Sequence, residues 1–483
     1  MDNFKKRFRE IIKEKKLIDS TISLIHWDLE TATPKKGQEL LSEMIGYLSL
    51  KSYNLYNSEE FKELLKKLQE NENSLSEIEK IELHEIQREL DSISKIPAEE
   101  YKEYSELTAK SQGIWEEAKL QNNFNLFQEY LEKIFAFNKK FIEYRGYEGH
   151  PYNTLLEDYE RGMTVEKLDI FFKNLREAIV PLLKKIVSKN HTIKNNFTSE
   201  EIPIWRQKNL TNFLADYLGF DREKGVVGIS EHPFTLDLDR NDVRITTKFI
   251  PTTPFSSVFS ILHETGHALY EQGSGDELVG TILAGGSSMG IHESQSRFYE
   301  NMVGRSLEFW EPLYEKLKEQ YPHMKDIEIE EFYRGINMVE PSLIRTEADE
   351  LTYCLHVMVR YEIEKALLEE KIKIADLPKI WNEKMKEYLG VEPASDAEGV
   401  LQDVHWSGGM IGYFPSYALG NAYAAQIYDT MRKELNIPEI LRNGDLFLIK
   451  DWLEKKIYHY GKSKTPAEII LEVTGKNSIV NSI

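Results

Sequence analysis

The sequence predicts a mainly α-helical protein that contains one small antiparallel β-sheet. Apolar residues recur at helical spacing along most of the chain, and charged residues occupy the positions between them. Alternation of apolar and polar residues, which is typical of a half-buried strand, is convincing only within residues 232–247. Many amphipathic helices and one short alternating stretch therefore favour a helical fold with a small accessory sheet.

Composition fits one large unit with a charged exterior. Of the 483 residues, 41% are hydrophobic and 29% are charged, which is sufficient for a core beneath a solvated surface. We expect a single unit over residues 1–483, with a helical N-terminal lobe over 1–195 and a second lobe, carrying the candidate site, over 196–483. The net charge of −20 argues against a nucleic acid or an anionic membrane as partner.

The single cysteine bears on where the protein works. Cys354 has no second cysteine to pair with, so an internal disulfide is excluded, and its helical, apolar surroundings predict a buried side chain. The N-terminus has no apolar segment of signal-peptide length, and no run reaches the length of a membrane span. We therefore expect a cytoplasmic protein without a membrane anchor.

The N-terminal part is predicted to be helical almost throughout. Residues 1–25 begin as an amphipathic helix, and residues 26–34 are expected to form a loop. We interpret His26, which lies beside Trp27 in this loop, as a structural residue. The pattern over residues 59–145 predicts long charged helices, which we expect to form one wall of a cleft.

A predicted β-hairpin precedes the most informative helix of the chain. Residues 232–239 and 243–247 alternate between apolar and polar types, and the polar residues between them can turn. The next segment, 254–272, is predicted to be one helix, with Pro254 at its first position and Thr253 as its cap. An edge strand beside this helix offers main-chain hydrogen bonds to an extended peptide.

The helix over 254–272 carries a candidate metal site. His263 and His267 lie four residues apart and project from the same helical face, where two imidazoles can bind one Zn²⁺ ion. Glu264 can act as a general base towards an activated water without being a ligand. The five-residue pattern also arises by chance on surface helices, so the interpretation depends on a third ligand.

Glu293, within His292-Glu-Ser-Gln295, supplies that third ligand thirty residues after His263. One carboxylate with two imidazoles leaves a fourth zinc position open, which is the arrangement of a catalytic site.

Two later segments are expected to face the cleft. Residues 341–370 are predicted to form a long helix with Arg345 in its first turn, from which the side chain can reach the cleft. Residues 407–417 are rich in glycine and aromatic side chains and are expected to form a loop beside His405.

Together these motifs resemble the Taq-type metallocarboxypeptidase family, and the resemblance extends over most of the chain. The segments that carry it occur in the family's order: His232-Pro-Phe234, Asp242-Val-Arg-Ile-Thr246, His263-Glu-x-x-His267, His292-Glu-Ser-Gln295 and Gln402-Asp-Val-His-Trp406. The resemblance implies a two-lobed helical fold with a deep central cleft, related to neurolysin and angiotensin-converting enzyme. It also implies a homodimer, a divalent metal (zinc or cobalt), and removal of single C-terminal residues from peptides with broad specificity.

Carried over by position, the resemblance assigns His263, His267 and Glu293 as metal ligands and Glu264 as general base. It also places the Tyr413–Tyr417 loop against the substrate.

The remaining candidates concern the substrate. We expect His405, with Tyr413 or Tyr417, to stabilise the oxyanion, and His232 to contact the substrate. Arg345 is the candidate for binding the free carboxylate, because a guanidinium matches a carboxylate with two parallel hydrogen bonds. Arg244 is the second candidate, although pairing with Asp242 within the hairpin is the favoured interpretation of Arg244.

Three alternatives stay open. An aminopeptidase of the same metal type would need an acidic group for the free amine, and no Gly-x-Met-Glu-Asn segment precedes His263. An endo-acting zinc oligopeptidase would cleave terminally amidated peptides. A non-catalytic protein that binds a metal or a peptide would have no use for Glu264.

Overall fold

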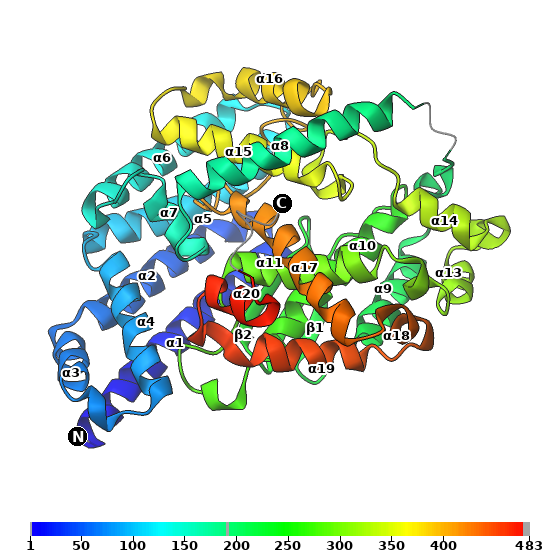
Figure 1. The fold of residues 1–483 in the computed structure, drawn as a ribbon. Helices are drawn as coiled ribbons and strands as arrows, with labels where there is room; N and C mark the ends of the chain where they lie inside the picture. The colour runs from blue at the N-terminus through cyan, green and yellow to red at the C-terminus, as the bar shows by residue number, and fades with distance from the viewer. Residues whose placement is uncertain (1, 190–192, 477–483) are drawn as a thin grey trace.

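The computed structural model describes residues 2–189 and 193–476, and most of this part is helical (Figure 1). The first eight helices are α1 (Asp2–Thr31), α2 (Gln38–Asn57), α3 (Glu59–Gln69), α4 (Glu77–Ile93), α5 (Ala98–Leu120), α6 (Asn125–Arg145), α7 (Asn153–Tyr159) and α8 (Val165–Val187). The prediction of a mainly α-helical protein is confirmed.

The helices of the second half surround the candidate site. They are α9 (Ile204–Leu218), α10 (Pro254–Gln272), α11 (Met289–Arg297), α12 (Leu307–Trp310), α13 (Tyr314–Gln320), α14 (Ile329–Ile336), α15 (Tyr353–Leu368), α16 (Leu377–Leu389), α17 (Phe414–Glu434), α18 (Ile437–Asn443), α19 (Phe447–Lys456) and α20 (Pro466–Thr474). In Figure 1, α11 and α17 lie together near the centre of the molecule, and they form the most extensive helix pair.

The small sheet contains the predicted hairpin and one further strand. Its order is β1 (Gly225–Ile229), β3 (Asp242–Thr247), β2 (Thr235–Asp239), with β2 antiparallel and β1 parallel to β3. The hairpin is therefore confirmed. The parallel strand β1 was missed because its Gly-Val-Val-Gly-Ile sequence shows no apolar–polar alternation. Both β2 and β3 pack on α10, so the sheet supports the helix that carries the candidate ligands.

Helix α1 is longer than predicted, because the loop expected over residues 26–34 begins only after Thr31. Trp27 explains the difference. Its ring lies 5.5 Å from that of Phe234, and a Cβ atom at Gly228 would lie only 2.9 Å from it. The glycine of β1 thus leaves room for the tryptophan, and packing on the sheet extends the helix beyond its local signal.

Two other local predictions were wrong. Pro254 does begin α10, but the Thr253 side chain makes no capping hydrogen bond. The helix predicted over 341–370 begins only at Tyr353, and Arg345 lies in a separate 3₁₀ turn, Arg345–Glu347. The Asp349 carboxylate accepts hydrogen bonds from two following backbone N–H groups, and this local turn competes with a continuous helix.

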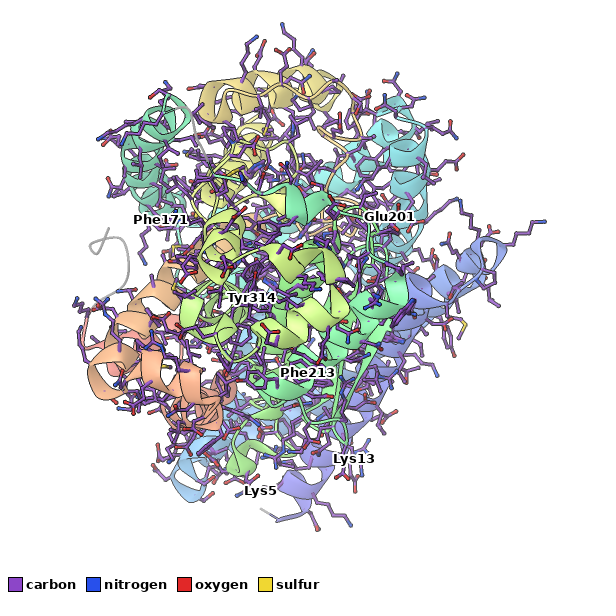
Figure 2. The ribbon with its side chains drawn as sticks, turned by 90° about the vertical axis from the view of Figure 1, so that its right-hand side faces the viewer. Lys5, Lys13, Phe171, Glu201, Phe213 and Tyr314 are labelled. Atoms are coloured by element: carbon purple, nitrogen blue, oxygen red, sulfur yellow. The ribbon has the colours of Figure 1, made fainter. Side chains whose placement is uncertain are left out.

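The core of the described residues is one large cluster of apolar side chains with two smaller ones. The large cluster runs from Trp115 to Val473. One smaller cluster joins α1, α3 and α4 through contacts such as the 5.2 Å stack of Phe8 on Phe61, and the other contains Ile25, Ile45 and Ala109. Side chains fill the space between the helices, as Figure 2 shows around Phe213 and Tyr314. The boundary between the predicted lobes stays a prediction, because residues 190–192 of the connector lie outside the described residues.

Among the described residues, no helix is long and apolar enough to cross a membrane.

Glu364 of α15 ties the glycine-rich loop to the helical core. Its carboxylate accepts hydrogen bonds from the Tyr152 hydroxyl, from Trp406 Nε1 at 2.7 Å and from the Gly412 N–H at 2.9 Å. Burial raises the pKa of Glu364 to about 7, although these three donors favour the ionised form. The loop that carries His405 and Tyr413 is thus fixed through one buried carboxyl group.

This raised pKa predicts a pH dependence of stability. The folded state holds the proton more tightly than the unfolded state, so stability falls as the pH rises from the unfolded towards the folded pKa. Between about pH 5 and pH 8 the wild type should lose about 2–3 kcal/mol of unfolding free energy relative to Glu364→Gln, which cannot titrate. Denaturant unfolding of both proteins at the two pH values measures this, and a constant difference would contradict it.

Candidate metal centre

Three candidate residues meet at one point between α10 and α11. The Nε2 atoms of His263 and His267 lie 3.6 and 3.5 Å from the same Oε2 atom of Glu293. One donor atom from each residue lies within 4.8 Å of the other two. Two imidazole nitrogens and a carboxylate oxygen are a donor set that suits Zn²⁺ with one position left open, so these residues fit a catalytic metal.

Two glycines allow Glu293, the third candidate ligand, to approach the two histidines. A Cβ atom at Gly266 of α10 would lie 2.6 Å from the Gln295 carbonyl oxygen of α11. On the opposite side, a Cβ atom at Gly420 of α17 would lie 2.5 Å from Cβ and Cγ of Glu293. Helix α11 can therefore lie between α10 and α17 only because both positions lack a side chain.

A network of charged side chains contacts His263 and Glu293 on the side away from the candidate metal position. The Nδ1 atom of His263 lies 2.8 Å from Glu300, and Arg297 donates to both Glu293 and Glu300 at 2.7 Å. Burial opposes ionisation of Glu293, but His263 and Arg297 outweigh it and hold the pKa of this carboxyl well below its usual range. Glu293 is thus a carboxylate, as a metal ligand requires.

Glu264 is anchored by the sheet. Its Oε2 atom accepts a hydrogen bond of 2.6 Å from the Thr235 hydroxyl of β2, and only 5% of the residue is exposed. Burial raises the pKa of Glu264 above its ordinary value. The side chain points from the ligand-bearing helix towards the edge strand.

Four predicted substrate residues also come together. His405 Nε2 lies 2.8 Å from the Tyr417 hydroxyl, and its ring centroid lies 5.4 Å from Tyr413 and 6.1 Å from His232. Burial lowers the pKa of His232 to about 4 and that of His405 well below its ordinary value, so both imidazoles are neutral at pH 7. Among the described residues, His232 Nε2 and His405 Nδ1 have no hydrogen-bond partner, which leaves both atoms for a ligand.

Arg345 lies beside these rings, although not in the first turn of α15. Its guanidinium is 4.6 Å from the Tyr417 ring centroid, and it donates to Asp403 at 2.9 Å and to the Tyr353 hydroxyl at 2.7 Å. Its Nη2 lies 2.8 Å from Asp403 but lacks hydrogen-bond geometry, so this N–H group has no acceptor in the described structure. Asp403 also pairs with Arg360 at 2.6 Å, so two guanidinium groups share one carboxylate.

Arg244 has a different environment. Its guanidinium makes two hydrogen bonds of 2.8 Å to Asp242 and lies 5.7 Å from the Trp27 ring. The pairing favoured from the sequence is confirmed, and these contacts link β3 to α1. The contribution of Arg244 to substrate binding stays a prediction.

Sequence reasoning gave no role to several residues that hold the site. Arg297 and Glu300 follow Glu293 by four and seven residues, a spacing that places all three on one helical face and was available as a signal. Asp403 lies within a recognised motif. The contact of Glu271 with His292 becomes visible only in the folded structure, where the end of α10 lies against the loop before α11.

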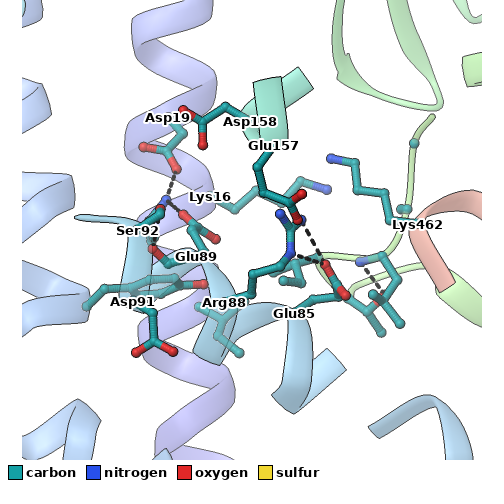
Figure 3. A pocket seen from close by; sticks show the side chains of 18 of the residues that line it. Lys16, Asp19, Glu85, Arg88, Glu89, Asp91, Ser92, Glu157, Asp158 and Lys462 are labelled. Atoms are coloured by element: carbon teal, nitrogen blue, oxygen red, sulfur yellow. Dashed lines mark hydrogen bonds and ion pairs between the residues drawn. The ribbon is translucent and has the colours of Figure 1, made fainter. Parts of the chain in front are cut away.

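A cavity of about 1630 Å³ extends along β2 away from these residues. Its walls come from α1, α4, residues 153–164, β2 and the 280–285 loop, and Figure 3 shows acidic and basic side chains facing one another across it, with Arg88 beside Glu85. The three candidate ligands do not line it. Asp237 does, and it lies two residues along β2 from Thr235, which contacts Glu264. The cavity therefore approaches the metal centre along the edge strand.

Comparison with known proteins gives a consistent result. Residues 7–482 match the family model described as carboxypeptidase Taq (M32) metallopeptidase. The chain is 44% identical to carboxypeptidase 1 of Bacillus subtilis, covering 98% of this chain and 95% of that protein. It is 37% identical to thermostable carboxypeptidase 1 of Pyrococcus furiosus, covering 94% and 92%.

Solved structures agree with these sequence matches. The crystal structure described as BsuCP superposes with a TM-score of 0.97 at 44% identity, over 99% of this chain and 97% of that one. An oligoendopeptidase F from Bacillus anthracis, 12% identical, superposes with a TM-score of 0.61 over 99% and 89% of the two chains, which shows a shared fold alone.

The contact of α17 with α11 generates a prediction. In Gly420→Ala the new methyl group would overlap Glu293, so the variant should lose about 1–3 kcal/mol of unfolding free energy despite the better helix propensity of alanine. It should also bind Zn²⁺ more weakly, because Glu293 is displaced. Thermal unfolding of the metal-free protein and a chelator-competition titration measure the two effects.

Gly113→Ala in α5 is the matched control, because its Cβ atom would meet only the flexible end of Gln38, at 3.0 Å. The control should be at least as stable as the wild type, because alanine favours the helix, and it should keep wild-type metal affinity. Similar behaviour of the two variants would show that close packing at Gly420 does not position Glu293.

Proposed function

The chain belongs to the carboxypeptidase Taq (M32) family of metallopeptidases, and from this premise we propose how its residues divide the work of peptide hydrolysis. Family membership makes it a metal-dependent carboxypeptidase, an enzyme that removes C-terminal residues from peptides. We propose His263, His267 and Glu293 as the metal ligands. The observation that carries this proposal is the convergence of their three donor atoms.

Glu264 is the proposed general base. A divalent metal held by the three ligands supplies Lewis acidity, which polarises the scissile carbonyl and makes water easier to deprotonate. Glu264 takes the proton from the attacking water and delivers it to the leaving amine. The hydrogen bond from Thr235 leaves Oε1 of Glu264 for this transfer while it fixes the carboxylate plane.

The hydroxyls of Tyr413 and Tyr417 are the proposed donors to the oxyanion that forms on the carbonyl oxygen. A preorganised donor of this kind contributes roughly 3–4 kcal/mol to catalysis. His405 positions Tyr417 through the 2.8 Å contact, and Tyr413 packs against the same imidazole.

Arg345 is the proposed partner of the substrate's terminal carboxylate. Arg345 and Arg360 share the single charge of Asp403, so this buried end of the site keeps a net positive charge. The Arg345 Nη2–H has no acceptor among the described residues, so it can donate to a bound carboxylate. The neutral His232 donates from Nδ1 to the Pro233 carbonyl, so its Nε2 can only accept a hydrogen bond from the substrate. This arrangement supports selection of a free C-terminus over an internal peptide bond.

The upstream part of the substrate is proposed to pair with β2. The Phe234 carbonyl accepts from the Thr246 N–H, so main-chain groups of alternate residues, Thr235 and Asp237, turn towards the free edge of the sheet. A peptide added along this edge passes Glu264 and continues into the cavity. Main-chain pairing accounts for broad specificity, because it reads no side chain.

We further propose zinc as the metal, with cobalt able to replace it, and a cytoplasmic homodimer as the working form. The donor set supports zinc. The dimer and the location rest on the family resemblance and on the single cysteine.

The general-base assignment predicts a separation of metal binding from turnover. Glu264→Gln should bind Zn²⁺ with wild-type stoichiometry, because residue 264 is not a ligand. Its kcat should fall by about two to four orders of magnitude, because an amide cannot accept the proton. Elemental analysis and steady-state hydrolysis of a tripeptide measure both quantities.

Glu293→Ala is the contrasting variant, and it should lose the metal as well as activity. Near-normal kcat in metal-loaded Glu264→Gln would remove Glu264 from the mechanism.

A further inference from the structure

A second histidine lies directly behind one of the proposed ligands. His292 Nδ1 is 2.6 Å from His267 Nδ1, and His292 Nε2 is 2.5 Å from Glu271 Oε1. Only 4% of Glu271 is exposed. The three side chains therefore form a hydrogen-bonded series that starts at the candidate metal centre, where His267 and His292 are 14% and 13% exposed, and ends at a buried carboxylate.

Only one placement of protons gives each contact among His267, His292 and Glu271 both a donor and an acceptor. His267 Nε2 faces Glu293, so this nitrogen keeps its lone pair for the metal and Nδ1 carries the proton. His292 Nδ1 must then accept, which leaves the proton of His292 on Nε2, where Glu271 accepts it. Each ring has a defined tautomer only because the next group in the series fixes it.

We propose that His292 and Glu271 are positioning residues for His267, and that they fix the rotation and the tautomer of its ring so that Nε2 points at the metal. The inference rests on the proposed ligand role of His267. It concerns residues that themselves touch neither the substrate nor the metal.

The surrounding loop is shaped to hold these two side chains. The Gly286 N–H donates to Glu271 Oε1 at 3.0 Å, and a Cβ atom at Gly286 would lie 2.5 Å from Cδ2 of His292. The Ser287 N–H donates to the Tyr270 hydroxyl at 3.0 Å, which closes the loop over the pair. His292 thus lies between the Gly286 backbone and the Tyr270 ring, whose centroid is 5.1 Å from that of the imidazole.

The two ligand histidines differ in a way that supports this role. His263 contacts the Glu300 carboxylate directly, and Arg297 neutralises that charge. No arginine or lysine of the described residues forms an ion pair with Glu271. The His292 ring keeps this charge one imidazole away from the metal and still supplies the acceptor that His267 needs.

Metal affinity tests the proposal without reference to hydrolysis. His292→Leu keeps the volume and removes both nitrogens, whereas His292→Asn keeps an acceptor near the place of Nδ1. His292→Leu should weaken Zn²⁺ binding by about 10- to 100-fold in a chelator-competition titration, because outer hydrogen-bond partners typically contribute that much. It should also change the visible absorption spectrum of the Co²⁺-loaded protein.

The His292→Asn variant distinguishes a positioning role of His292 from a role in packing alone. His292→Asn should recover most of the lost affinity and the wild-type Co²⁺ spectrum, which a purely structural role would not predict. His150→Leu is the matched control, because His150 contacts Glu369 at 3.1 Å in a similar pair far along the chain from the site. This control should bind both metals like the wild type.

Several outcomes would overturn the proposal. His292→Leu binding Zn²⁺ within about threefold of the wild type would do so, as would His292→Asn proving no better than His292→Leu. If His292→Leu does not fold, Gly286→Ala supplies the same test, because its methyl group pushes the ring without removing it. Full metal content in Glu293→Ala would instead show that the proposed ligand set itself is wrong.

Discussion

The site depends on the close passage of α11 between α10 and α17. Both contacts occur at glycines, Gly266 and Gly420, and any side chain at either position would meet the backbone of α11 or the stem of Glu293. This double contact sets the distance between Glu293 and the two histidines, because the ligands come from different helices. The glycine inside the five-residue metal motif is therefore a packing requirement, separate from the chemistry of its neighbours.

Charge is distributed unevenly between the two ends of the site. Around the proposed ligands, carboxylates predominate, and each of the two histidines has its own outer partner, Glu300 or His292. At the other end, Arg345 and Arg360 share Asp403, and the positive charge of Arg345 adds to burial in lowering the pKa of both His232 and His405. Although the protein has a net charge of −20, the Arg345 end of its site is positively charged and can bind an anionic group.

Local patterns predicted the parts of the site that lie on one helix. The bounds 254–272 agree with α10, because helical periodicity is a short-range signal, and the predicted third residue, Glu293, lies beside the two histidines of that helix. Two boundary predictions failed because local patterns did not decide them. Packing on the sheet extends α1 beyond Trp27, and a turn at Asp349 delays the start of α15 to Tyr353. A partner such as Glu271, which contacts His292, becomes identifiable only when separate segments fold together.

We propose that Arg345 makes this metal hydrolase act at a free C-terminus. The direct test compares kcat/KM of the wild type and Arg345→Ala on a peptide with a free carboxylate and on its amidated twin. We expect kcat/KM to fall roughly ten- to hundredfold on the free acid, because a buried charge-assisted pair contributes about that much to binding, and to change little on the slowly cleaved amide. Equal losses on both peptides would contradict it and assign Arg345 to structural support through Asp403.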